Sequence, residues 1–384
     1  MANPSRGWIV FGTMLVAVSL FFLRDESGIA HAQSTSCGTY TSTHINTEYS
    51  GSSEGTGCST STSTSSSSST STSTSSSTPT STPTTTGADS SGNSVNDLAK
   101  QRFNQMITNR VLGTVLLGIN EQVNCSDCVS AFGSAGSFSA GIHGRKSLTD
   151  NLSLLAGIAY TQYSEGGYSV TSAPITAFAL RYDFVDWGSS RPFFDIGTVL
   201  TPYEKVRYTR SYTTSLGAVS LDSQTTASNY AVYGRAGWMS RLSPRDEVAA
   251  SVEVWQLWQR VAGYTDPAGA PLNPFDATVA GGTDKTSLVK VGGQWTHLFG
   301  SSVEANINGG WVQSFATHSG IIATVTGDGT VVPTIGNQGW FEYGGRLGFR
   351  ITKGWVADLF LNGTAGPQPV GNTVHGGVGL RISY

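Results

Sequence analysis

The chain has 384 residues, among them 47 glycines, 9 tryptophans and 14 tyrosines, and only 12% of its side chains are charged. A soluble domain usually carries about twice that share of charge. The formal net charge of -3 and the pI near 6.1 exclude a basic surface for nucleic acid, so no nucleic-acid partner is expected.

Residues 1 to 32 have the pattern of a secretory signal peptide. Arg6 precedes an apolar run over residues 8 to 23, and small residues around Ala32 make Gln33 the expected start of the mature protein. The run is short for a helix that spans a membrane, which needs roughly 20 apolar residues; an uncleaved anchor is the alternative. Export brings the cysteines into an oxidising compartment.

Residues 33 to 93 predict a low-complexity linker or short passenger. From residue 59 to residue 86 every residue is Ser or Thr except Pro79 and Pro83. Such a segment cannot bury enough apolar surface to offset the entropy of ordering, so we expect a disordered stalk, either glycosylated or bare. Cys37 and Cys58 precede the tract, and a local disulfide is their simplest pairing.

Residues 94 to 110 predict an amphipathic helix. Ser94 is a suitable N-cap, and the apolar residues after it recur at spacings that place them broadly on one side. At 1.5 Å per residue the helix is about 25 Å long, close to the thickness of a membrane. The apolar residues are Val95, Leu98, Phe103, Met106 and Ile107, and the basic ones are Lys100, Arg102 and Arg110.

From residue 111 onward apolar and polar residues alternate, which predicts strands with one apolar face. In residues 341 to 351 the odd positions are mainly apolar and are opposed by Glu342, Arg346 and Arg350. If the apolar faces meet lipid, the polar parity lines a lumen. The predicted lumen-lining residues are Arg181, Asp195, Glu253, Lys290, Glu304, Glu342, Arg346 and Arg350, with Asp183, Asp358 and Arg381 on the same parity.

The connections and the aromatic residues favour a membrane barrel over a soluble all-β fold. Short turns are expected near residues 149–151, 186–191, 243–247, 299–302 and 352–354, and longer loops near 164–172, 201–226, 261–284, 316–338 and 366–371. Outer-membrane barrels sort their connections in this way and carry an aromatic girdle at each interface. One predicted girdle is Tyr182, Trp238, Trp295, Trp355 and Tyr384, and the other is Tyr160, Tyr230, Trp258, Trp311 and Tyr343.

The number of strands completes the expected fold. We count eleven clear strands back from Tyr384, the earliest over residues 129 to 147. Bacterial single-chain barrels have an even number of strands, so residues 111 to 123 are expected to supply a twelfth. The sequence therefore predicts an all-β fold, a twelve-stranded antiparallel transmembrane β-barrel over residues 111 to 384, preceded by the helix.

A helix followed by such a barrel, ending in Gly-Leu-Arg-Ile-Ser-Tyr, resembles the translocator (β) domain of bacterial autotransporters, the type V secretion proteins. The resemblance covers roughly residues 94 to 384 and implies an outer-membrane location in a Gram-negative bacterium, a helix inside the lumen and an N-terminal segment displayed outside. It also implies that Gly379, Ile382 and Tyr384 belong to a signal for the barrel assembly machinery. The passenger is short for this family, and the helix has no Asn-Asn pair for self-cleavage.

Cys125 and Cys128 form a Cys-x-x-Cys. With a strand over residues 111 to 123, they would lie at the outer tip of the first hairpin. A thioredoxin site needs a βαβ context and a zinc site needs two further ligands, so a local disulfide between Cys125 and Cys128 is the favoured interpretation.

Three functions are compared. The first is a surface anchor that displays the Ser/Thr-rich segment, with adhesion as its use and outer-membrane lipids, lipopolysaccharide and a host or neighbouring-cell surface ligand as partners. The second is a pore for small solutes. The third, an outer-membrane enzyme, is disfavoured because His143, His297, His318 and His375 are scattered, so no catalytic residue, cofactor or metal is expected.

Overall fold

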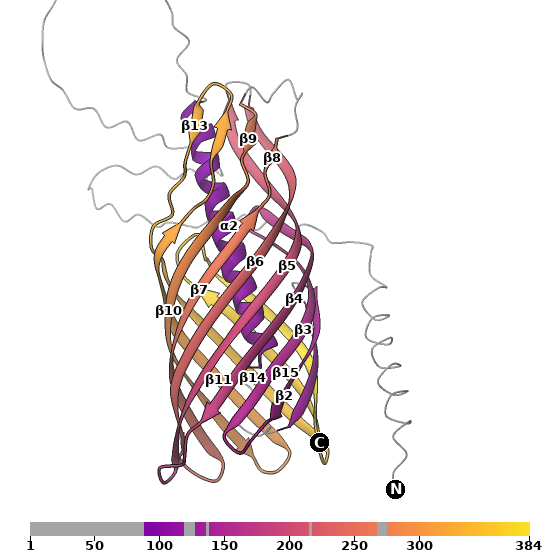
Figure 1. Cartoon of the computed structure of the whole chain (residues 1–384). Helices are drawn as coiled ribbons and strands as arrows, with labels where there is room; N and C mark the ends of the chain where they lie inside the picture. The colour runs from indigo at the N-terminus through magenta and orange to yellow at the C-terminus, as the bar shows by residue number, and fades with distance from the viewer. Residues whose placement is uncertain (1–87, 119–126, 136–137, 215–216, 267–274) are drawn as a thin grey trace, which may run out of the picture. The chain divides into compact units, whose positions relative to one another are not determined.

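The structure is a computed structural model that describes residues 88 to 384 except 119–126, 136–137, 215–216 and 267–274. The predicted signal peptide and nearly all of the linker therefore lie outside the described residues. The same holds for Cys37, Cys58 and Cys125, so the predicted disulfides stay predictions. Figure 1 labels the elements used below.

Twelve strands form one closed antiparallel barrel, which confirms the predicted fold class. The chain closes on itself because β1 pairs with β16, from Cys128 opposite Ser383 to Ala135 opposite Gly376. The barrel strands are β1 (Cys128–Ala135), β2 (Phe138–Ser147), β3 (Leu152–Glu165), β4 (Tyr168–Asp183), β5 (Ser190–Thr214), β6 (Gly217–Arg241), β7 (Asp246–Val261), β10 (Gly282–Phe299), β11 (Val303–His318), β14 (Gly339–Thr352), β15 (Trp355–Ala365) and β16 (Thr373–Ser383).

The outer face of the barrel is apolar. Ile158, Val254 and Ile307 are each more than half exposed although they lie in the middle of strands. A surface of this kind is stable only against lipid, which makes the barrel a transmembrane one. None of the ten residues of the two predicted girdles is buried, as expected for side chains at the two lipid interfaces.

The barrel has two unlike ends. At the turn end, short connections join β2 to β3, β4 to β5, β6 to β7, β10 to β11 and β14 to β15. At the loop end, two of the predicted loops are wrong, because residues 164–172 and 201–226 lie largely in strands. There β3 and β4 turn at Gly166 and Gly167, and β5 and β6 continue to Thr214 and Gly217. These strands extend beyond the apolar belt. In the extended part they stay hydrogen-bonded to each other, but their outward-facing residues are polar.

The helix α2 (Ala88–Leu116) lies inside the barrel, where it packs mainly against β5 (Figure 1). It is longer than the predicted residues 94 to 110. Both its apolar and its polar residues are buried over most of the length from Val95 to Arg110, so the wall contacts more of the helix than the apolar side predicted from the sequence. From Val95 to Arg110, only Asp97 and Lys100 are exposed. Among the residues described, no helix combines the length and apolar character needed to cross a membrane.

The predicted first strand, residues 111 to 123, is also wrong. Residues 111 to 116 continue α2, and Val111, Leu116 and Leu117 are buried in the lumen. The twelfth strand comes instead from residues 129 to 147, which divide into the hairpin of β1 and β2. The predicted number of strands is therefore confirmed, but the predicted position of the twelfth strand is wrong. Cys128 consequently starts β1 at the turn end, opposite Ser383, and not at the outer tip of a hairpin.

Two long connections at the loop end form a second, four-stranded sheet, hereafter the cap sheet. It contains β8 (Tyr264–Thr265), β9 (Ala277–Val279), β12 (Ala323–Val325) and β13 (Gly329–Val331). Val279, Ile321 and Ala323 share a buried apolar cluster with Val95 and Leu98 of the helix. The cap sheet therefore covers the first turns of α2 (Figure 1).

Two glycines allow the end of α2 to approach the wall. A Cβ at Gly113 would lie 2.6 Å from Val199, and a Cβ at Gly157 of β3 would lie 2.7 Å from the carbonyl oxygen of Leu116. Real Cβ atoms do not approach other heavy atoms so closely, so the helix seats only because both positions lack a side chain.

Gly157→Val should displace the end of α2 from the wall, because overpacking a buried contact costs about 1–3 kcal/mol. We expect faster trypsin cleavage after Arg110 in the folded protein. Gly234→Val is the matched control, since a Cβ at Gly234 meets no atom within 4 Å. Equal cleavage rates in the two variants would contradict the close packing.

Candidate functional site in the barrel lumen

The helix is fixed near the loop end by a buried ion pair. The Nε of Arg102 donates to Oδ2 of Asp284 on β10 at 2.7 Å, and the side chains are 0% and 6% exposed. Oδ1 of Asp284 accepts from the backbone N–H of Gly320 at 2.7 Å, in the connection that carries the cap sheet. One carboxylate thus joins the helix, the wall and the cap.

Glu204 of β5 is a second buried anchor. Gln105 and Asn109 of the helix both donate to its carboxylate, Asn109 at 2.7 Å. Asn229 of the wall donates to the same carboxylate at 2.6 Å. Glu204 has no exposed surface, so these amide groups replace the water that a free carboxylate would bind. The contact requires α2 to present both amides on one side, four residues apart.

Arg110 makes the third connection, with Glu342 of β14. Lys290 reaches the other oxygen of Glu342 at 3.2 Å, and the indole N–H of Trp340 donates to this carboxylate at 3.0 Å. The guanidinium of Arg110 also lies over the ring of Trp255, 5.4 Å from its centroid. Two of the three basic helix residues named in the sequence analysis thus meet lumenal carboxylates. Lys100 instead pairs with Asp97 in an exposed contact.

Arg210 of β5 closes the loop end over the start of the helix. Its Nη1 donates to the hydroxyl of Ser94 at 3.1 Å, and its Nε donates to Asp266 at 2.8 Å. Asp266 also accepts from Ser223 and from the backbone N–H of Ala277. Ser94 is therefore not the first residue of the helix, as predicted, but a buried contact between the helix and the residues around the cap sheet.

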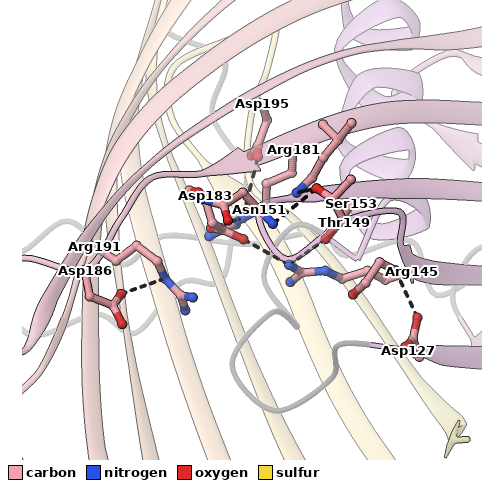
Figure 2. A network of polar contacts seen from close by, with 12 residues as sticks. Asp127, Arg145, Thr149, Asn151, Ser153, Arg181, Asp183, Asp186, Arg191 and Asp195 are labelled. Atoms are coloured by element: carbon pink, nitrogen blue, oxygen red, sulfur yellow. Dashed lines mark hydrogen bonds and ion pairs between the residues drawn. The ribbon is translucent and has the colours of Figure 1, made fainter.

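A polar network of the wall occupies the turn end, and Figure 2 shows its best-connected part. Arg181 donates to Asp183 at 2.8 Å, and Arg145 reaches the same carboxylate at 3.2 Å. Arg235 pairs with Asp195, and Arg181 and Arg235 both stack on the ring of Phe193. Buried guanidinium groups need such partners, because an unpaired buried charge is costly.

A second wall network lies beside the closing strands. Arg346 pairs with Glu304 and, at 3.1 Å, with Asp358, while Arg381 of β16 reaches both carboxylates at 3.5 and 3.4 Å. Two cations and two anions alternate across β11, β14, β15 and β16. The network ties the last strand to its neighbours through side chains as well as backbone.

The structure places the predicted lumen-lining residues on the inner face, with one exception. Arg181, Asp195, Glu253, Glu304, Glu342 and Arg346 are buried, and Lys290 is largely so. Arg350 has the predicted parity, but it lies beside the turn after β14 and is exposed, outside both networks. A small pocket of about 30 Å³, lined partly by Arg235, Glu253 and Lys290, lies towards the turn end.

The sequence missed four residues that hold the helix or its cover, namely Glu204, Arg210, Asp266 and Asp284. All four fall in segments that were expected to be loops. The alternation of Glu204, Val206, Tyr208 and Arg210 as inward residues with Lys205 and Arg207 as outward residues was a usable signal. This alternation was missed because the outward residues of the segment are polar and so do not form the apolar face by which the other strands were predicted.

The proposed assembly signal lies at the seam between β16 and β1. Gly379 is opposite Phe132, and Ile382 is opposite Val129. Tyr384 is 71% exposed, its ring lies 5.4 Å from the ammonium group of Lys146, and its N–H donates to the carbonyl of Asp127 at 3.3 Å. The N–H of Ser147 and the side chain of Lys146 both lower the pKa of Asp127 at this rim.

Cys128 is disulfide-bonded, and the chain's other cysteines lie outside the described residues. Its pairing with Cys125 stays a prediction. A link between these two residues would close a small loop at the turn end, directly before β1.

The histidines that the structure describes do not form a common site. His143 lies inside β2 beside Phe132, with ring centroids 5.9 Å apart, and His375 lies in β16. His297 contacts Asp246 at 2.7 Å, but the hydroxyl of Ser243 donates to Asp246 and not to the imidazole. In a serine nucleophile activated by histidine, the serine hydroxyl donates to the imidazole. The described residues contain no group of three His, Cys, Asp or Glu placed to hold a metal ion.

Comparisons with known proteins give structural matches alone. No family model matches the chain, and no curated protein matches it. The β domain of the Bordetella autotransporter BrkA is 17% identical, covers 67% of this chain and 98% of its own, and has a TM-score of 0.42. The translocator domain of the autotransporter NalP from Neisseria meningitidis is 11% identical, covers 77% and 100%, and has a TM-score of 0.47.

The Ralstonia pickettii toluene transporter TbuX is a third solved structure of this kind, with 11% identity, coverage of 71% and 92%, and a TM-score of 0.40. All three TM-scores are below 0.5. The fold of this chain is therefore established by its own strand pairing, and its function has to be argued from its own residues.

Arg102→Met should loosen the helix, because removing one member of a buried ion pair costs about 3–5 kcal/mol. We expect faster hydrogen exchange of the α2 amides, with part of the protection restored in the double variant Arg102→Met/Asp284→Asn. Lys100→Met is the matched control, since an exposed pair contributes about 0–1 kcal/mol. An equal loss of protection in the control would refute this anchoring role.

Proposed function

We propose that this protein is an outer-membrane barrel of autotransporter type that anchors a short Ser/Thr-rich N-terminal segment and displays it at the surface of a Gram-negative bacterium. The observation that carries the proposal is the direction of α2. Ser94, in the N-terminal part of the helix, is buried against Arg210 near the loop end, and the last turn of the helix lies against Gly157 deeper in the lumen. The N-terminal end of α2 therefore lies on the side of the long connections.

The orientation of the barrel follows from its two ends. Outer-membrane barrels place short turns in the periplasm and longer connections outside the cell. Here the turn end would face the periplasm, and the cap sheet and the projecting hairpin of β5 and β6 would face outward. The same orientation puts residues 33 to 87 outside the cell, where a Ser/Thr-rich stalk would meet a surface ligand.

Helix retention supports anchoring over transport. Three buried carboxylates, Asp284, Glu204 and Glu342, hold successive turns of α2, and the cap sheet covers its start. A helix bound in this way keeps the displayed segment attached to the membrane. It also occupies the space through which small solutes would pass, so a pore requires its removal.

The partners in this proposal have distinct surfaces. Lipids, including lipopolysaccharide, would contact the apolar belt and the girdles, and the barrel assembly machinery would bind the strand that ends in Gly379, Ile382 and Tyr384. The proposed anchoring function involves no chemical reaction, so it requires no catalytic group or cofactor.

An epitope inserted after Thr60 should be reached by antibody on intact cells, because the segment before α2 emerges at the loop end. The matched control is the same epitope between β4 and β5, at the turn end, which should be reached only after the outer membrane is permeabilised. Protection of the Thr60 epitope on intact cells would refute surface display.

Deletion of residues 88 to 116 should convert the closed barrel into a pore. We expect an increase in single-channel conductance in planar bilayers, because α2 and its contacts no longer fill the lumen. Deletion of residues 59 to 86, which leaves the helix intact, is the control and should keep the low conductance. If both deletion variants conduct like the full-length chain, the helix is not the plug.

A further inference from the structure

The outer face of the barrel carries exposed basic residues just above the loop-end girdle. Arg260 lies two residues beyond Trp258 on β7, and Lys285 of β10 pairs directly with Trp258. Lys205 of β5 is opposite Ser172 of β4. Ser172 lies two residues above the β4 residue that is opposite Tyr160. Arg207 follows two residues further along β5. These four side chains are called the outer basic cluster.

The cluster lies on the lipid-facing side of the wall. On β7 it continues the row of Val252, Val254 and Trp258, and on β10 it precedes the outward Val291 and Trp295 in the same parity. The girdle marks the level of lipid headgroups. Side chains one step above it therefore reach the layer in which outer-leaflet lipids carry their polar groups.

At two positions of this level, an inward carboxylate is followed in the chain by an outward lysine. Glu204 points inward to the helix while its neighbour Lys205 points outward, and Asp284 points inward while Lys285 points outward. Within the part of the chain that the structure describes, none of the four cluster side chains forms an ion pair. The inner cations Arg102, Arg110 and Arg210 all have carboxylate partners.

The spacing of the cluster suits phosphate. Arg260 is opposite Thr283, so Arg260 and Lys285 are diagonal neighbours, which places their Cα atoms about 7–8 Å apart. Lys205 and Arg207 are about 7 Å apart along one strand. Long basic side chains at such distances converge on a single phosphate, and arginine binds it with two parallel N–H groups.

We propose that the outer basic cluster binds the phosphate groups of an outer-leaflet phosphorylated glycolipid, the lipid A part of lipopolysaccharide, whose acyl chains lie along the apolar belt below. This inference rests on the proposed orientation, in which the loop end faces outward. It assigns a specific lipid contact to Lys205, Arg207, Arg260 and Lys285. The neighbouring girdle aromatics would contact the same lipid at the boundary between its sugars and its acyl chains.

The test uses the full-length protein in detergent and native mass spectrometry with lipid A, dephosphorylated lipid A or inorganic phosphate. We expect retention of lipid A, about tenfold or more weaker retention of the dephosphorylated lipid, and a similar loss in the variant Lys205→Gln/Arg207→Gln/Arg260→Gln/Lys285→Gln. The matched control is Arg241→Gln/Arg245→Gln/Arg350→Gln/Lys353→Gln, which removes four exposed charges at the turn end and should bind as the unmodified chain does.

Equal retention of both lipids, or undiminished lipid A binding by the cluster variant, would overturn the proposal. Displacement of lipid A by inorganic phosphate alone would also overturn it, because it would show an anion site without lipid specificity. A cluster variant that keeps its heat-modifiable migration on gels is folded, so loss of binding is then a property of the surface. The assay is independent of the Thr60 epitope, so failure of display and failure of lipid binding are distinguishable.

Discussion

Closure of the strand ladder is the constraint on which the rest of this structure depends. Lipid offers no hydrogen-bond partner to a backbone N–H or C=O, so a sheet in a membrane is stable only if no edge is left open. Here the condition is met by the pairing of β1 with β16. Closure also fixes which residues face inward, because each strand presents alternate residues to two environments. The apolar belt, the girdles and the lumenal charges are all consequences of this one pairing.

Once the wall is closed, the polar side chains on its inner face need hydrogen-bond or ion-pair partners inside a confined lumen. The barrel supplies these partners in two ways. Towards the turn end, wall residues pair with one another, as Arg181 does with Asp183. Towards the loop end, the carboxylates of Glu204, Asp284 and Glu342 find their partners on α2. The helix is thus part of the electrostatic balance of the wall, and removing it leaves buried carboxylates without their principal partners.

Much of this arrangement could be predicted from the sequence, and the failures have physical reasons. Alternation, turn positions and the aromatic girdles are properties of single strands, so they were readable. The end of α2 was not, because Val111, Val115 and Leu117 fit both a strand face and a buried helix. The position of Cys128 followed that error. The long hairpin and the cap sheet were missed because they lie beyond the membrane, where the outward residues lose the hydrophobic signal while the hydrogen-bonded ladder continues.

The seam itself has a consequence for the order in which the molecule is built. β1 and β16 are the first and last strands of the wall, so their ladder joins the most distant parts of the chain and carries the largest loop-closure entropy. If β1 and β16 pair last, a helix that already lies between the strands is enclosed by that pairing. A helix that is still outside must then enter along the barrel axis. The cap sheet covers the start of α2, so it also blocks the axial route from the loop end. A helix that is in place before β1 and β16 pair is enclosed without having to pass along the axis.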